Sequence, residues 1–127
     1  MAKSKVLIID DEKLARTMLT DLLRGKEYTV VAAEDGPSGL AAAKREKPNV
    51  IILDVMMPGM DGFEVCQALK NDAATTGIPV IILTASEEPH LTRKAFKAGA
   101  AFTLVKASKP EQLLSTLHLA LSLARLT

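Results

Sequence analysis

Short apolar, β-branched runs alternate along this chain with longer stretches in which apolar residues recur at helical spacing. We predict strands over residues 6–9, 29–33, 50–54, 80–84 and 102–106. Strict alternation of strands and helices is typical of parallel strands joined by crossover helices. The pattern therefore predicts an α/β fold, a doubly wound parallel sheet of five strands with helices on both faces.

The segments between these strands carry the apolar period of helices that pack one face onto a sheet. We predict helices around residues 14–23, 40–45, 63–69, 91–96 and 110–125. Several strands are apolar throughout, as expected when helices cover both faces of a parallel sheet. In the last helix the stripe expected to cover the sheet consists of Leu113, Leu114, Leu117, Ala120, Leu121 and Ala124.

The chain has the size and composition of one globular domain. It has 127 residues, 48% of them hydrophobic and 24% charged, so we expect a single folded domain over residues 1–127. The net charge of +1, without a basic block, gives no reason to expect nucleic acid as a partner. Since no signal peptide pattern or membrane-length apolar run is present, we predict a cytoplasmic protein. The single cysteine, Cys66, should pack in the core.

Acidic residues follow two of the predicted strands at the point where each strand ends. Asp10, Asp11 and Glu12 come directly after residues 6–9, and Asp54 ends the run 50–54. In a doubly wound sheet, ligands bind outside the carboxyl ends of the strands, so these acids should face one crevice. Three acids at one strand end would repel one another without a cation, which favours a metal site.

Two later strands also end in polar residues, Thr84 and Lys106. Together these residues resemble, over essentially the whole chain, the receiver domain of two-component response regulators, the CheY-like family. The residues that carry the resemblance are Asp10, Asp11, Asp54, residues 57–62, Thr84, Ala85 and Lys106. The resemblance implies the flavodoxin-like strand order 2-1-3-4-5. It also implies a signalling module, not an enzyme, that accepts a phosphoryl group from a histidine kinase or phosphotransfer protein.

The resemblance makes Asp54 the phosphoacceptor and gives its neighbours supporting roles. Mg²⁺, or Mn²⁺, would be held by Asp11, Asp54 and the backbone carbonyl of Met56, with Asp10 acting mostly through bound water. Lys106 would bring its charge to the phosphoryl oxygens.

Thr84 would offer the phosphoryl group its hydroxyl, and Ala85 is small enough to let that group approach. In this family the side chains at Met56 and Ser86 tune the lifetime of the phosphorylated state. Neither can hold an attacking water as an acid or amide would, so we predict slow to moderate self-dephosphorylation.

The chain departs from the family pattern at two positions near the last strand. A proline in a cis peptide usually follows the lysine, whereas Ala107 follows Lys106 here. A cis bond without proline costs roughly 2.5–4 kcal/mol, so either the surrounding fold supports that strain or the loop after the strand takes a trans route. We favour the cis bond because Lys106 must still reach the phosphoryl site. The family usually carries a mobile Tyr or Phe where this chain has Thr103, and Phe102 should point to the opposite face of the strand. In the family, that ring moves in response to the hydroxyl that Thr84 supplies here, so in this chain the response would end in the smaller side chain of Thr103.

Three helix signals have a structural interpretation. Asp35 and Asp61, each beside a glycine, are expected to be helix caps or turn residues. Ser108 and Glu111 match the capping-box pattern, which places Pro110 at the second helical position. His90 and His118 lack ligand-spaced companions, so we expect them at the surface.

The last helix also carries Leu119, Leu123 and Leu126 on its other side. Scattered surface leucines are common, but three on one face favour a partner or homodimer surface. We expect phosphorylation to change association with a downstream protein target or a second copy through the last two helices and strand five. By resemblance, kinase choice would rest on the first helix and the loop after strand five.

Two other functions remain open on the sequence. Ala107 and Thr103 are compatible with a receiver-like scaffold that works without phosphorylation. A more remote alternative is an Asp-nucleophile phosphatase, because Asp10 and Glu12 have the two-residue spacing of that class.

Overall fold

One parallel sheet of five strands forms the centre of the molecule. The computed structural model describes residues 3–57, 59, 61–86 and 88–125. The strands are β1 (Lys5–Ile9), β2 (Thr29–Ala33), β3 (Val50–Asp54), β4 (Val80–Thr84) and β5 (Phe102–Val105). Their order is β2-β1-β3-β4-β5, which confirms both the doubly wound sheet and the order implied by the resemblance.

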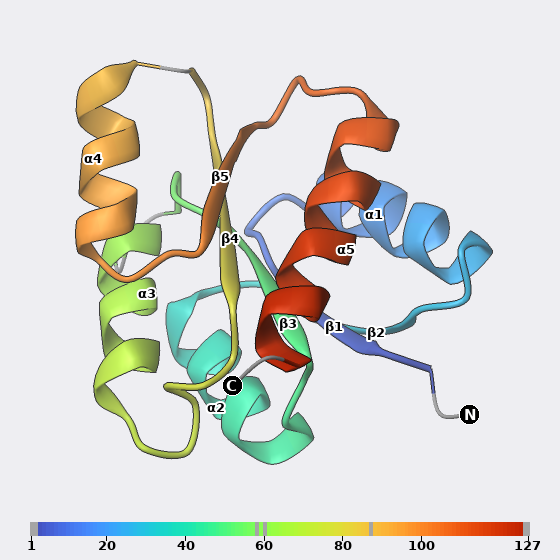
Figure 1. The fold of residues 1–127 in the computed structure, drawn as a ribbon, viewed down its shortest axis with the longest axis horizontal. Coiled ribbons are helices and arrows are strands. Elements are labelled where there is room, and N and C mark those ends of the chain that lie inside the picture. The colour runs from blue at the N-terminus through green and yellow to red at the C-terminus, as the bar shows by residue number, and fades with distance from the viewer. Residues whose placement is uncertain (1–2, 58, 60, 87, 126–127) are drawn as a thin grey trace.

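A helix follows each strand, as predicted. The helices are α1 (Lys13–Gly25), α2 (Gly36–Glu46), α3 (Gly62–Asn71), α4 (Pro89–Lys97) and α5 (Pro110–Arg125). In Figure 1, α1 and α5 lie on one side of the sheet and α3 and α4 on the other. Two apolar clusters match this division, one between the sheet and α1 with α5, the other between the sheet and α2, α3 and α4.

Burial differs between the central strands and the edge strands. Every residue of β3 and β4 is buried, because each strand pairs on both sides and has helices over both faces. The edge strand β5 pairs only with β4 and is half-buried along its whole length. In Figure 1, β4 and β5 run upward, so the loops that follow them lie at the top of the molecule.

Asp35 and Asp61 are helix caps, as predicted. The Asp35 carboxylate accepts from the Ser38 amide at 2.8 Å, and the Asp61 carboxylate accepts from the Glu64 amide at 2.9 Å. Gly62 begins α3 directly against the end of β3, and a Cβ there would overlap Val55 Cα and lie 2.5 Å from the Asp54 carbonyl oxygen. Glycine at this position lets α3 start where the loop after Asp54 returns to the sheet.

The start of α5 differs from the prediction. Pro110 is the first helical residue, where its missing N–H costs nothing. The residue before it, Lys109, donates its amide to Gln112 Oε1 at 3.1 Å. The predicted capping box of Ser108 and Glu111 is therefore wrong by one residue, because the helix begins one residue later than that pattern assumes.

The end of β5 also corrects the sequence analysis. The strand ends at Val105, although the Lys106 amide still donates to the Thr84 carbonyl at 2.7 Å. All peptide bonds between described residues are trans, so the predicted cis Lys106–Ala107 bond is wrong. The Lys106 ammonium reaches Asp54 from a trans backbone, and the cost of a cis bond is avoided.

Cys66 packs in the core as predicted, and burial raises the pKa of its thiol to about 11. Leu126 lies outside the described residues. Among the helices that the structure describes, none combines the length and apolar character needed to cross a bilayer.

Candidate functional site

Asp10 and Asp54 meet at the carboxyl edge of the sheet, as predicted. Asp10 directly follows β1 and Asp54 ends β3, and these strands pair with Ile9 opposite Leu53. Both carboxylates are buried, with only 1% of each residue exposed. The Asp10 amide donates to the Ala33 carbonyl at 3.1 Å, which extends the β1–β2 pairing to this residue. The sheet itself therefore holds two carboxylates side by side.

One ammonium group faces both carboxylates. Lys106 Nζ lies 3.2 Å from Asp54 Oδ2 and 3.5 Å from Asp10 Oδ2. It also lies 3.3 Å from Oε1 of Glu12, an exposed residue after β1. The Lys106 side chain is 28% exposed, so it crosses from solvent to the buried acids. One ammonium group thus forms ion pairs with three acids.

Burial and charge shift the titration of Asp54 and Lys106. Burial and the nearby charge of Asp10 raise the pKa of the Asp54 carboxyl, although the Met56 amide and Lys106 act in the opposite direction. Burial disfavours the charged form of Lys106, but the hydrogen bond that its ammonium donates to Asp54 and the charges of both acids raise its pKa overall. The site carries excess negative charge that a second cation would relieve.

The acidic cluster fits a divalent cation. Oxygens of Asp10, Asp11 and Asp54 all lie within 4.8 Å of one another. Asp10 uses Oδ1 to accept from the Glu12 amide at 2.9 Å. Its buried Oδ2 has no hydrogen-bond partner among the described residues. Carboxylate oxygens suit Mg²⁺, which keeps several waters and takes few protein ligands.

Met56 lies at the site through its backbone. Its amide donates to Asp54 Oδ1 at 3.1 Å, while its side chain is exposed. This hydrogen bond fixes the turn after β3 against the carboxylate. The role of the Met56 carbonyl as a metal ligand stays a prediction.

The predicted phosphate-binding hydroxyl points elsewhere in this structure. Thr84 is buried at the end of β4, and its hydroxyl donates to the Ser86 carbonyl at 2.7 Å. Ala85 and Ser86 are exposed, and Thr103 is half-buried in β5. The structure therefore brings Asp10, Asp11, Asp54 and Lys106 together, but it does not hydrogen-bond Thr84 to any of them.

Two contacts of this site were not assigned from the sequence. Glu12, considered only as one of three acids, pairs with Lys106. Arg16 had no assigned role, and it donates to the Asp10 carbonyl at 2.8 Å. Arg16 lies in the first turn of α1, within reach of the end of β1, and no sequence signal specifies its bond to the Asp10 carbonyl.

Comparison with known proteins places these residues in a family. The family model described as the response regulator receiver domain matches residues 6–118. The chain is 36% identical to the protein PilH of Pseudomonas aeruginosa, covering 94% of this chain and 98% of PilH. It is 42% identical to the response regulator PleD of Caulobacter vibrioides over 81% of this chain, but spans only 23% of PleD.

Solved structures agree with this assignment. The chemotaxis protein CheY4 of Vibrio cholerae superimposes with a TM-score of 0.89 at 37% identity, covering 94% of this chain and 99% of CheY4. The receiver domain of a sensor histidine kinase from Pseudomonas aeruginosa, at 24% identity, shares the fold with a TM-score of 0.87, covering 95% of this chain and 99% of that domain. That domain has a magnesium ion coordinated in its active-site cleft.

Proposed function

The chain belongs to the response regulator receiver domain family, and we propose that it is a phosphoacceptor of two-component signalling, with Asp54 as the accepting residue. The donor would be a phosphohistidine of a histidine kinase or of a phosphotransfer protein. The observation that supports this most is the placement of a buried Asp54 carboxylate beside a second buried carboxylate and one lysine. An aspartate that only capped a helix or turn after its strand would not need a buried position beside a second carboxylate and a lysine.

The proposed step exchanges one covalent bond for another. A carboxylate oxygen of Asp54 forms a bond to phosphorus while the P–N bond to the donor imidazole breaks. The electron pair of that bond goes to the imidazole nitrogen, which takes a proton from solvent. The product on this chain is an aspartyl phosphate, and the histidine is regenerated.

The residues of the site would stabilise the charge that gathers on the phosphoryl oxygens. Lys106 Nζ, already 3.2 Å from Asp54 Oδ2, would transfer its hydrogen bonds to a phosphoryl oxygen. Thr84 would release the Ser86 carbonyl and offer its hydroxyl instead, and Ala85 beside it leaves room for the group. Positioning and electrostatics of this kind dominate phosphoryl transfer.

Asp10, Asp11, Asp54 and the Met56 carbonyl are the proposed ligands for Mg²⁺. When bound, the ion neutralises negative charge on the phosphoryl oxygens. Asp10 Oδ2 supports a ligand at this position, since this buried oxygen accepts no hydrogen bond from a described residue and has only the ion pair of 3.5 Å with Lys106. Magnesium in the related sensor kinase receiver domain supports the choice of metal.

We place the docking surface for the donor on α1, beside the acidic site. Leu14 and Met18 are large apolar side chains exposed on this helix. Under Met18 a cavity of about 260 Å³ reaches Lys106, and its other apolar residues include Leu19, Leu22, Leu104, Pro110 and Leu113. An apolar helix bearing the phosphohistidine could pack here with its imidazole near Asp54.

The output surface that we propose is formed by α4, β5 and α5. Leu119 and Leu123 are exposed on α5, and Phe96 is exposed on α4. Phosphorylation would act on this surface by favouring one of two pre-existing arrangements. The partner would be a downstream protein target or a second copy of this chain.

The test is a gain in intact mass. The protein is incubated with Mg²⁺ and acetyl phosphate, and we expect the mass of one phosphoryl group on the parent and none on Asp54→Asn. Asp35→Asn is the matched control, because asparagine caps a helix as well as aspartate and the Asp35 carboxylate bonds to Ser38, not to a residue of the site. If the parent gains no mass, a receiver-like scaffold that works without phosphorylation is favoured. Steady turnover of a small phosphomonoester would instead favour an Asp-nucleophile phosphatase.

A further inference from the structure

A polar cavity opens between α4, β5 and the start of α5. Its volume is about 290 Å³, and six of its lining residues carry a hydroxyl or an amide: Thr84, Ser86, Thr92, Thr103, Ser108 and Gln112. Leu104 and Val105 complete the lining. None of the acids or Lys106 of the phosphoacceptor site lines it, and Thr84 is the residue through which the cavity adjoins that site.

Several hydrogen-bonding groups of this cavity are uncommitted. The side chains of Thr92, Thr103 and Ser108 make no hydrogen bond to any other described residue. Gln112 uses its Oε1 to accept from the Lys109 amide, which leaves its side-chain NH₂ available as a donor. A ligand that displaces water from these groups must replace the lost hydrogen bonds, since unpaired polar groups are costly.

The lining restricts the charge and shape of a ligand. It contains no acidic or basic side chain, so a charged group would lose its water without gaining a counter-charge. It does contain the apolar surface of Leu104 and Val105, against which a ring can pack. The best match is an uncharged ring that carries one group able both to donate and to accept.

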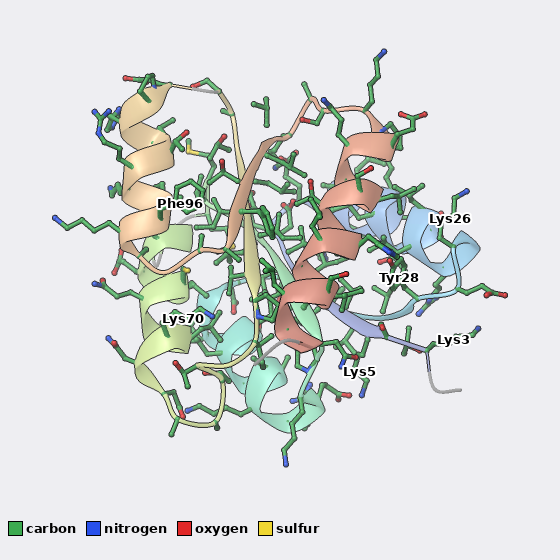
Figure 2. All side chains as sticks on the ribbon, in the orientation of Figure 1. Lys3, Lys5, Lys26, Tyr28, Lys70 and Phe96 are labelled. Atoms are coloured by element: carbon green, nitrogen blue, oxygen red, sulfur yellow. The ribbon has the colours of Figure 1, made fainter. Side chains whose placement is uncertain are left out.

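Exposed apolar side chains beside the cavity point to a protein as the source of that ring. Phe96 follows Thr92 by one helical turn on α4, and Figure 2 shows it beside α4, toward β5. Leu119 follows Gln112 by two turns on α5 and is also exposed. Both helices thus present a cavity-lining residue and an apolar residue on one face.

We propose that this cavity binds the phenol side chain of a tyrosine from a protein partner, and that Thr84 couples its occupancy to phosphorylation. The phenol is uncharged at neutral pH, and its hydroxyl both donates and accepts. The coupling part rests on the proposed function. Thr84 and Ser86 form one wall through the hydrogen bond of 2.7 Å, so a Thr84 that turns to a phosphoryl group changes that wall.

The first test uses p-cresol, the side chain of tyrosine, as the probe. We expect saturable shifts of the Thr92 and Thr103 methyl signals in NMR titrations, with affinity at least fivefold tighter than for toluene or 4-methylbenzoate. Thr103→Val keeps the shape but removes a hydroxyl, and it should weaken p-cresol binding several-fold. Ser115→Ala, on α5 but outside this cavity, should leave it unchanged. Equal affinity for p-cresol and toluene, or no saturation, would overturn the proposal.

The second test addresses the coupling. After treatment with Mg²⁺ and acetyl phosphate, the affinity for p-cresol should change several-fold in the parent and stay constant in Asp54→Asn. An unchanged affinity in protein shown by mass to be phosphorylated contradicts the coupling. If p-cresol binds but no phosphoryl group is ever gained, the phosphoacceptor function fails and the cavity assignment stands.

Discussion

The two halves of the carboxyl edge of the sheet are built differently. Around β1 and β3, two buried carboxylates are fixed by backbone hydrogen bonds and face one lysine. Around β4 and β5, hydroxyl side chains open onto a cavity, and the Thr84 hydroxyl is bonded to its own loop. We propose that the first half, called the capture half below, accepts the phosphoryl group and that the second half responds to it.

The difference follows from position in the sheet. β3 is central and every residue in it is buried, whereas β5 is an edge strand and half-buried. A side chain at the end of a central strand is fixed by packing from all sides. One on an edge strand has fewer neighbours, so Thr103 can replace a bulky ring without disturbing the core.

The largest effect is expected from removing the cation of the capture half. In Lys106→Gln, Asp10 and Asp54 remain buried without their ammonium partner, so phosphorylation by acetyl phosphate should fall at least tenfold. The unfolding midpoint without metal should also fall, because a buried charge has lost its partner. The control is Lys109→Gln, a change in the same loop at an exposed lysine with no ion pair to a described residue. Equal phosphorylation of the two variants would contradict the role of Lys106.

A steric change tests whether the backbone around Asp54 is as constrained as the side chains are. In Gly62→Ala the new Cβ would overlap backbone atoms of Val55 and Asp54, so we expect a loss of about 1–3 kcal/mol in the free energy of unfolding. Gly77→Ala is the matched control, because nothing lies within 4 Å of its Cβ. Denaturant titration measures both, and similar midpoints would show that the end of β3 is freely deformable.

The stability of the metal-free domain should reveal the charge excess in the capture half. The pKa of Asp54 is raised mainly by burial, so its stabilising contribution is present at low pH and is lost as the pH rises through the raised value. Asp54→Asn should therefore raise the unfolding midpoint by a few degrees at pH 7 in EDTA. The advantage should shrink as the pH is lowered toward 4. A midpoint lowered at pH 7 would mean that Lys106 more than compensates the buried charge.

The smallest effect is expected on the lifetime of the phosphorylated state. Met56 and Ser86 offer no acid or amide to an attacking water, so the parent should hold its phosphoryl group for longer than seconds. Met56→Asn should shorten the half-life several-fold, as followed by intact mass after removal of the donor. A parent half-life of seconds would show that some other group activates the water.

Much of the capture half could be predicted from sequence, because it depends on strong and non-local constraints. Apolar runs set the strands, and the rule that carboxyl ends share one edge places Asp10 near Asp54. The strand order came from the family resemblance and could not be obtained from periodicity alone. The caps at Asp35 and Asp61 were also predictable, since each follows the preference of aspartate for a helix start.

Three details around β5 could not be predicted from the sequence, and the reason is physical. The choice between Ser108 with Glu111 and Lys109 with Gln112 as the helix start depends on differences of about 1 kcal/mol. The trans Lys106–Ala107 bond depends on how far a flexible lysine can reach, which only the three-dimensional arrangement decides. The bond from Thr84 to the Ser86 carbonyl is a rotamer choice, and no sequence pattern specifies it.

Whether Asp54 is the phosphoacceptor can be decided by locating the phosphoryl group chemically. An aspartyl phosphate is reduced by borohydride to homoserine, which peptide sequencing by mass spectrometry assigns to one position. After treatment with Mg²⁺ and acetyl phosphate, we expect homoserine at position 54 and nowhere else. Homoserine at Asp10 or Asp11, or none in protein that remains folded, would contradict it.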